Sequence, residues 1–467
     1  MSTLLVKNAT ILVTMDDQKR EIAFGGLFIR DGFIEQVGTT SELLNFLTGS
    51  GQAADEVLDL SGHILLPGLV NTHHHFYQTL TRVVPPAQDA NLFNWLKTLY
   101  PIWAGLTPED IYTSTQTALA ELAFSGCTTA SDHLYLFPNG SKLDDEIDAA
   151  KEIGMRLHAS RGSMSLSEKD GGLPPDSVVD TEEAILADSL RLIERYHDSK
   201  PGAMIQIVLA PCSPFSVTSE LMKQSAVLAR EYGVQLHTHL AETEDEEQFC
   251  LDMFGHRPVD YMKEVGWIGN DIWFAHSVYV NEEEIDLFAK EGCGVAHCPS
   301  SNMRLASGIA PIKELSAAGV KVSIAVDGSA SNDGSHLLGE VRQAMLLARV
   351  KEGITGYSLS SENRKLMTAR DALYLATRGG ANVLGRPDIG SLEVGKVADF
   401  FAIKLNSLGY AGALHDPVAA TVFAQPVKAN YTVVNGKFVV KEGQLVNVDE
   451  GKLVEKHNKA AKRLLEG

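Results

Sequence analysis

The sequence predicts an α/β protein, a (β/α)8 TIM-like barrel with a small β-sandwich domain formed by its N- and C-terminal segments. Three observations support this prediction. The middle of the chain alternates apolar, β-branched runs with segments of helical spacing. Both ends contain short strand-like runs broken by turn residues. Neither a G-x-G-x-x-G nor a P-loop motif is present, which weakens the alternative of an open nucleotide-binding sheet.

The two ends of the chain have the character of paired strands and turns. Residues 1–65 include the runs LLVKNATILVT and LFIRDGFIEQVG, with Asp31-Gly32 as an expected hairpin turn. Residues 386–467 include a strand over 395–403, a hairpin around Asn435-Gly436 and a terminal helix. We expect these two segments to pair into one small β domain beside the barrel.

The middle of the chain, residues 66–385, supplies the barrel. Segments such as 110–123 and 182–196 have helical spacing and separate the apolar runs. Eight strands in series favour a closed parallel barrel over a doubly wound sheet. The eight expected strands are Ile64–His75, Thr128–Leu136, Met155–Ser160, Ile205–Ala210, Val234–Leu240, Ile272–Val280, Gly294–Cys298 and Val320–Val326.

Composition restricts the location and the partners of the protein. The formal net charge of −20 over 467 residues disfavours nucleic acid polymers and anionic membranes, although an uncharged heterocycle remains a suitable ligand. The five cysteines contain no C-x-x-C pair, which indicates reduced thiols. The N-terminus lacks the apolar core of a signal peptide, and no apolar run reaches membrane-spanning length. We therefore expect a cytoplasmic protein.

The first chemical signal is the run PGLVNTHHH at the end of the first expected barrel strand. Side chains at i and i+2 of a strand point to the same face, so His73 and His75 should converge while His74 points away. Two imidazoles on one face are suitable metal ligands. The active sites of such barrels form at the carboxyl ends of the strands, which strengthens this interpretation.

The second signal is the run HTHLAE at the end of the fifth strand. His237 and His239 share a face, and Glu242 follows three residues after His239. A further metal ligand beside an acid–base group is what metal-activated water requires. His237 is equally compatible with a buried histidine behind the ligands.

The third and fourth signals lie at the ends of the sixth and eighth strands. His276 closes the first of these, and Asp327 closes the second after an apolar run. A buried aspartate needs a metal or a charged histidine as its partner. Capping of the next helix is the alternative for Asp327. Together the four signals supply three histidines and one aspartate, with His276 and Glu242 as acid–base groups.

The motifs PGLVNTHHH, HTHLAET, FAHSV, AHCPSSNMRLASG and VDGSASND resemble those of the amidohydrolase superfamily, in the branch of chlorohydrolases and deaminases. The resemblance implies hydrolysis of a C–N bond in a cyclic amidine, with release of ammonia. It also implies roles for the site residues. One divalent cation, Zn²⁺ or Fe²⁺, would be bound by His73, His75, His239 and Asp327. Glu242 would move protons, and His276 with Asp327 would act on the attacking hydroxide.

The number of cations follows from the fourth strand. Dinuclear members of the superfamily use a carboxylated lysine there, whereas residues 205–214 contain no lysine. We therefore expect one cation, and the missing lysine also argues against a ring-opening hydrolase of the dihydropyrimidinase kind. A non-catalytic scaffold is disfavoured because all four expected ligands and Glu242 are present.

The runs HHHFYQTLTRVVPPAQD and SGCTTASDHLY most resemble the 8-oxoguanine deaminases, which convert 8-oxoguanine to urate. The rival substrates are isoxanthopterin, guanine and a triazine of the hydroxyatrazine type. The resemblance also implies a homo-oligomer, since relatives often form dimers or larger assemblies.

Several side chains are candidate substrate contacts beside Glu242. Gln78 offers an amide to a ring edge. Trp95 offers a stacking surface, as do Tyr100 and Trp103, with packing under a lid as the alternative for all three. Arg161 is expected to face the barrel mouth, where it would bind the substrate or pair with a loop carboxylate. Cys212 stands where some relatives have a substrate-contacting histidine, and a neutral pocket wall is favoured over a metal ligand.

Overall fold

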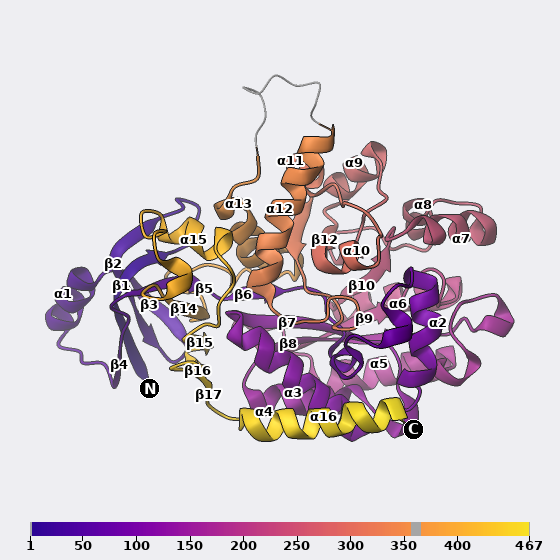
Figure 1. The fold of residues 1–467 in the computed structure, drawn as a ribbon, viewed down its shortest axis with the longest axis horizontal. Coiled ribbons are helices and arrows are strands. Elements are labelled where there is room, and N and C mark those ends of the chain that lie inside the picture. The colour runs from indigo at the N-terminus through magenta and orange to yellow at the C-terminus, as the bar shows by residue number, and fades with distance from the viewer. Residues whose placement is uncertain (1, 356–365, 467) are drawn as a thin grey trace.

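The centre of the molecule is a barrel of eight parallel strands (Figure 1). The computed structural model describes residues 2–355 and 366–466. The first and last strands are joined beyond their ends, where the Asp327 amide donates to the carbonyl of His73 at 3.2 Å. The predicted barrel is confirmed, with the strands β6 (Leu69–Asn71), β7 (Cys127–Leu134), β8 (Arg156–Ser163), β9 (Ile205–Pro211), β10 (Gln235–Leu240), β11 (Ile272–His276), β12 (Gly294–His297) and β13 (Lys321–Ile324).

Helices follow the strands and cover the outside of the barrel (Figure 1). Their apolar faces join the barrel strands in one large core. No helix within the described part of the chain is both long and apolar enough to span a membrane. The helices of the barrel region are α2 (Leu92–Trp103), α3 (Pro108–Phe124), α4 (Leu143–Ile153), α5 (Glu182–Tyr196), α6 (Ser219–Tyr232), α7 (Glu244–Phe254), α8 (Pro258–Glu264), α9 (Glu282–Glu291), α10 (Pro299–Arg304), α11 (Ile312–Ala318), α12 (Leu337–Thr355), α13 (Ala369–Tyr374) and α14 (Gly380–Val383).

The first predicted strand, Ile64–His75, is divided between two sheets. Its first part, β5 (His63–Pro67), pairs with β1 (Thr3–Val13) and β14 (Phe400–Lys404) of the small domain. The chain passes into the barrel at Gly68, where a Cβ atom would collide with the side chain of Thr128. The barrel part ends at Asn71, so His73 and His75 follow the strand instead of lying on it, which corrects the sequence-based expectation.

The small β domain contains strands from both ends of the chain, as predicted (Figure 1). Hydrogen bonds join all nine strands into one mixed sheet, so the expected sandwich is not made of two separately bonded sheets. The two halves of the sheet share an apolar core. The remaining elements are β2 (Glu21–Arg30), β3 (Phe33–Thr39), β4 (Glu56–Asp59), β15 (Tyr431–Val434), β16 (Lys437–Lys441), β17 (Gln444–Leu445), α1 (Thr40–Ser50) and α15 (Pro417–Phe423).

Both predicted hairpin turns are present. Asp31 and Gly32 have φ values of 48° and 83°, and Asn435 and Gly436 have φ values of 51° and 73°. Two successive left-handed residues are the signature of the tight turn that matches the twist of paired strands. Short polar or glycine side chains tolerate this backbone, which explains why the sequence identified both turns.

The C-terminal helix α16 (Glu450–Glu466) lies along the barrel next to α3, as Figure 1 shows. His457 of this helix is within hydrogen-bond distance of Thr79, with 3.0 Å between Nε2 and Oγ1. Thr79 belongs to a short 3₁₀ helix, Phe76–Thr81, that follows the first barrel strand and contains Gln78. The C-terminal helix therefore buttresses the segment that carries a candidate substrate contact.

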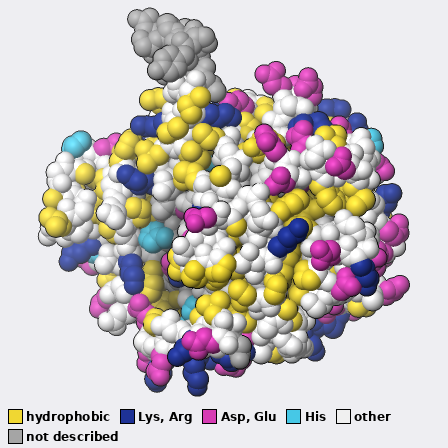
Figure 2. All heavy atoms as spheres, turned by 45° about the vertical axis from the view of Figure 1, so that its right-hand side comes forward, with side chains coloured by type: hydrophobic (Ala, Val, Ile, Leu, Met, Phe, Trp, Pro, Cys, Tyr) yellow, Lys and Arg dark blue, Asp and Glu magenta, His cyan; other side chains and the backbone are white. Residues whose placement is uncertain are grey.

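The surface of the protein is strongly charged. Figure 2 shows acidic and basic side chains interspersed over one face, with apolar side chains exposed between them. The interior differs, because a dense group of histidines and carboxylates is buried at one end of the barrel. That buried group is the main chemical feature of the fold.

An ion pair between two fully buried side chains connects the barrel to the small domain. Arg156 at the start of β8 binds both carboxylate oxygens of Asp399, and the two side chains are 0% and 2% exposed. Asp399→Ala would leave the guanidinium buried without its counter-charge, a change that typically costs about 3–5 kcal/mol. We expect a clearly lower unfolding midpoint in urea. Glu56→Ala, at the exposed pair with Lys441, should shift the midpoint little, because such pairs contribute roughly 0–1 kcal/mol.

Candidate metal and active site

Four side chains meet at the carboxyl ends of the barrel strands. His73 and His75 follow β6, His239 lies in β10, and Asp327 follows β13. The Nε2 atoms of His73 and His75 lie 3.3 and 3.5 Å from Oδ1 of Asp327. The Nε2 atoms of His75 and His239 are 3.1 Å apart. The structure thus brings together the four side chains that the sequence predicts as metal ligands.

Hydrogen bonds behind this cluster fix which nitrogen of His73 carries the proton. Nδ1 of His237 lies 2.9 Å from the carbonyl oxygen of Trp273, and it can only donate there. Nε2 of His237 must then accept from Nδ1 of His73, at 2.8 Å. Nε2 of neutral His73 is left with a lone pair, and this buried atom has no hydrogen-bond partner. His237 is therefore the buried histidine behind the ligands, one of its two sequence-based interpretations.

His75 and His239 also use Nδ1 as a hydrogen-bond donor and leave Nε2 with a lone pair. Nδ1 of His75 donates to the carbonyl of His133 at 2.7 Å, and Nδ1 of His239 donates to the carbonyl of Cys212 at 2.6 Å. Their Nε2 atoms consequently present two lone pairs to each other. Burial lowers the pKa of both imidazoles, to about 3 for His239, so both are neutral at pH 7. Converging lone pairs repel one another unless a cation lies between them, and the donor set fits Zn²⁺ or Fe²⁺.

The two oxygens of Asp327 face different partners. Oδ1 faces the Nε2 atoms of His73 and His75, whereas Oδ2 lies 3.9 Å from Nε2 of His276 and 3.4 Å from Oγ of Ser331. Burial opposes ionisation of this carboxyl, but the neighbouring histidines hold its pKa well below the usual range. One carboxylate can therefore serve a cation with one oxygen and an acid–base group with the other.

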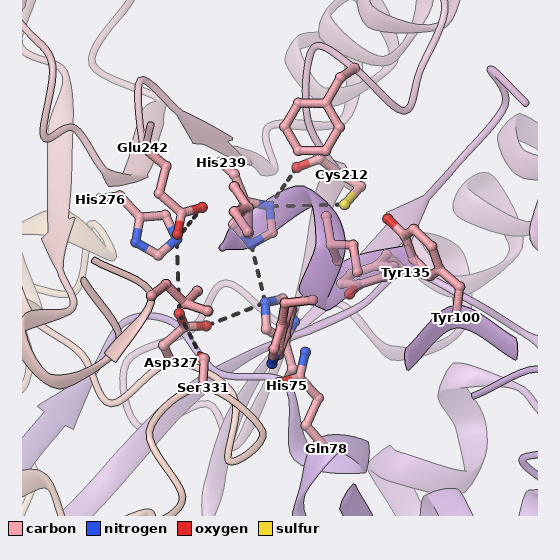
Figure 3. Close-up of a pocket in the computed structure, with 15 residues that line it drawn as sticks. His75, Gln78, Tyr100, Tyr135, Cys212, His239, Glu242, His276, Asp327 and Ser331 are labelled. Atoms are coloured by element: carbon pink, nitrogen blue, oxygen red, sulfur yellow. Dashed lines mark hydrogen bonds and ion pairs between the residues drawn. The ribbon is translucent and has the colours of Figure 1, made fainter. Parts of the chain in front are cut away.

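Glu242 and His276 form a pair on one side of the pocket (Figure 3). Nε2 of His276 is 3.4 Å from Oε2 of Glu242, and its Nδ1 donates to Asn302 at 2.9 Å. Burial raises the pKa of Glu242 to about 7. Burial lowers the pKa of His276, but the charges of Glu242 and Asp327 outweigh this effect and raise it above the ordinary value. Glu242 can thus both accept and give a proton near neutral pH.

The backbone is strained where three of these strands end. Ala241 beside Glu242, His276 itself and Asp327 itself have φ values of 52°, 72° and 63°. Left-handed backbone costs a non-glycine residue roughly 1–2 kcal/mol. Such strain is concentrated at functional sites, where the surrounding structure enforces it. Here it occurs where Glu242, His276 and Asp327 enter the pocket.

A pocket with an empty volume of about 390 Å³ opens beside the cluster (Figure 3). Gln78, Trp95, Cys212 and Glu242, all predicted as substrate contacts, line it. Helix α2 supplies part of the wall and covers the pocket with large side chains. The other lining residues are His75, Leu92, Leu96, Tyr100, Tyr135, Phe215, His239, His276, Leu305, Asp327 and Ser331.

Arg161 is a correction, because it does not line the pocket. Its guanidinium lies 3.0 Å from Asp188 of α5 and 3.9 Å from Asp180 in the preceding loop. Ser160 contacts Ser131 of the neighbouring strand, and adjacent residues of a strand point to opposite faces. Arg161 consequently points outward toward α5. The alternative of pairing with a loop carboxylate describes its position better than a substrate contact.

Two residues that line the pocket, Tyr135 and Ser331, were not predicted from the sequence. Tyr135, just beyond β7, and Ser331, in the loop after β13, line the pocket; they belong to the runs SGCTTASDHLY and VDGSASND, but neither was named as a candidate site residue. His133 also joins His73, His75 and His239 in a group whose nitrogen atoms lie within 4.8 Å of one another. Its position at the end of a barrel strand was the signal that could have identified it. Trp103, in contrast, is buried away from the pocket and donates to Thr81.

Comparisons with known proteins agree with this geometry. Residues 64–439 match the family model described as the amidohydrolase family. The 8-oxoguanine deaminase of Pseudomonas aeruginosa is 49% identical over the whole of both chains. A hydroxydechloroatrazine ethylaminohydrolase from a Pseudomonas species is 38% identical, covering 100% of this chain and 97% of the relative. An atrazine chlorohydrolase of Arthrobacter aurescens, solved with zinc, is 32% identical, with a TM-score of 0.91 and coverage of 98% and 100%.

The barrel and its cluster of histidines and carboxylates define a hydrolase of the metal-dependent kind. The chain belongs to the amidohydrolase family, and its relatives are deaminases and aminohydrolases that cleave C–N bonds. The resemblance found in the sequence is therefore confirmed.

Proposed function

We propose that this enzyme deaminates 8-oxoguanine, using one water molecule to release urate and ammonia. The observation that carries the proposal is a small enclosed pocket in which Glu242, with a pKa of about 7, faces His276 beside a cation-binding cluster. The relative with 49% identity is an 8-oxoguanine deaminase, which supports this choice of heterocycle.

We further propose that His73, His75, His239 and Asp327 hold a single Zn²⁺, with Fe²⁺ as the alternative. The fourth barrel strand, IQIVLAP, has no lysine to bridge a second cation. When bound, a divalent cation lowers the pKa of water, so that a strong nucleophile exists near neutral pH.

Glu242 performs the proton transfers in this mechanism. Its carboxylate accepts a proton from the attacking water and delivers it to the ring nitrogen beside the amine-bearing carbon. Protonation of that nitrogen makes the carbon electrophilic. A pKa of about 7 suits both steps, because the ionised and protonated forms coexist near neutral pH.

His276 and Asp327 complete the reaction. Asn302 accepts from Nδ1 of His276, so Nε2 of the charged imidazole is available to donate to the oxygen that attacks the ring. Oδ2 of Asp327 lies on the His276 side and removes the hydroxyl proton as the C–N bond breaks. Asp327 passes this proton to the amine, which leaves as ammonia, and the carbon becomes a carbonyl.

The test is amine release by zinc-loaded protein, measured as ammonia from 8-oxoguanine, guanine and isoxanthopterin and as ethylamine from hydroxyatrazine. We expect 8-oxoguanine to give the highest kcat/KM, with one urate formed for each ammonia. A higher value for another member of the panel would replace the substrate while keeping the reaction type. No amine release from any of them would contradict the proposal.

A further inference from the structure

A buried hydroxyl group without a partner lies in the pocket wall. Tyr100 of α2 lines the pocket and is 1% exposed, and its hydroxyl oxygen makes no hydrogen bond to any of the described residues. A buried hydroxyl loses its hydrogen bonds to water, so it is normally paired with another polar group. The lack of a partner within the protein indicates that a ligand provides it.

The position of Tyr100 shows which part of a ligand would reach it. Figure 3 places Tyr100 and Tyr135 on the side of the pocket opposite Glu242 and His276. The amine-bearing carbon of a substrate must lie at Glu242 and the cation-binding cluster. The end of a fused ring remote from that carbon therefore extends toward Tyr100.

Three other polar side chains of the pocket already make hydrogen bonds. Nε1 of Trp95 donates to the carbonyl of Ala330 at 3.1 Å, and Oε1 of Gln78 accepts from the Ala330 amide at 3.4 Å. Ser331 donates to Gly328 and Asp327. These contacts leave the Tyr100 hydroxyl as a free group at the remote end of the pocket.

A phenol hydroxyl at this position favours a carbonyl oxygen as its partner. Burial raises the pKa of Tyr100 well above the usual range, so the group stays protonated and can donate. Guanine has only a C–H group at the outermost point of its second ring, whereas 8-oxoguanine has an oxo group there. Isoxanthopterin likewise has an oxo group on its second ring where pterin has a C–H group.

We propose that Tyr100 is a specificity-determining residue whose hydroxyl donates to an oxo group on the substrate ring remote from the amine. This inference rests on the proposed function for the orientation of the ring. It names the substrate class as fused aminopyrimidinones that carry an oxo group on the second ring.

The test is the preference for oxo over non-oxo substrates in Tyr100→Phe. We expect the ratio of kcat/KM for 8-oxoguanine to that for guanine to fall about 10- to 100-fold, because an unpaired buried carbonyl is costly. The guanine value itself should change little. The same loss should appear for isoxanthopterin relative to pterin. An unchanged ratio in both pairs would overturn the inference.

Tyr410→Phe is the matched control. Tyr410 is also buried and its hydroxyl also lacks a partner, but it does not line the pocket. This variant should leave both ratios unchanged, and a fall equal to that of Tyr100→Phe would overturn the inference.

Equilibrium binding of urate and xanthine separates this inference from the proposed function. Urate carries the second-ring oxo group and xanthine does not, and neither needs turnover. Wild-type protein should prefer urate, and Tyr100→Phe should lose that preference. Absence of deamination by wild-type protein would contradict the proposed function, while the urate and xanthine affinities would still decide the role of Tyr100. Equal affinities in the wild type would overturn the inference.

Discussion

Glu242→Gln should retain its bound metal and lose about 10²–10⁴-fold in kcat, the usual contribution of a general acid–base group. Glutamine has nearly the same shape as glutamate but cannot take a proton from water. The variant should still fold, because Ser307 donates to Oε1 of Glu242 at 3.4 Å and a glutamine oxygen can accept the same hydrogen bond. The measurements are ammonia release under saturating substrate and metal content per chain.

Glu340→Gln provides the matched control for this substitution. Glu340 is also buried, and burial raises its pKa to about 7, but it does not line the pocket. It accepts hydrogen bonds from Ser300, which a glutamine oxygen can still do. Near-normal turnover by Glu242→Gln, or an equal loss in Glu340→Gln, would show that proton transfer does not depend on Glu242.

The sequence was informative about this site because barrel strands end in a common plane. His276 and Asp327 each close a run of apolar residues, His239 lies near the end of its strand, and side chains at the carboxyl ends of parallel strands converge. Pattern and chemistry therefore indicate the same side chains. The left-handed backbone at His276 and Asp327 could not be predicted, since neither residue is a glycine and tertiary contacts impose that conformation.

The expected positions of Arg161, His73 and His75 were wrong because they depend on strand alternation and on where a strand ends. Arg161 belongs to a strand that was predicted nearly correctly, yet its alternation places it against α5 instead of the barrel mouth. His73 and His75 were expected on a strand that actually ends at Asn71. They still converge, because hydrogen bonds from His73 to Nε2 of His237 and from His75 to the His133 carbonyl fix their rings.

The pocket wall was the least predictable part. Tyr100 reaches the pocket because α2 folds over the barrel mouth, and the periodicity of that helix alone does not specify which side faces the substrate. Tyr135 and Ser331 lie in connections whose paths depend on packing against the rest of the molecule. The four expected metal ligands were thus found from the strand ends, His133 at another strand end was missed, and residues that depend on loop paths were found only in part.

His239→Ala should remove the cation and lower kcat by about 10³-fold or more, since Lewis-acid stabilisation is worth several kcal/mol. Elemental analysis of the purified variant should find far less than one metal per chain. His237→Phe should have a weaker effect, about 10–100-fold in metal affinity, because His237 only orients His73. This difference in effect distinguishes a residue that binds the cation, His239, from one that orients another ligand, His237.

Thermal unfolding gives an independent measure of cation binding at this cluster. Binding to the folded state alone stabilises a protein, so wild-type Tm should fall on treatment with a chelator and recover with zinc. His239→Ala should show little response to either, because the cluster has lost one of its converging lone pairs. His256→Ala is the control at an exposed histidine paired with Glu264, and it should respond as the wild type does. A full metal equivalent and wild-type turnover in His239→Ala would mean that the cation binds elsewhere.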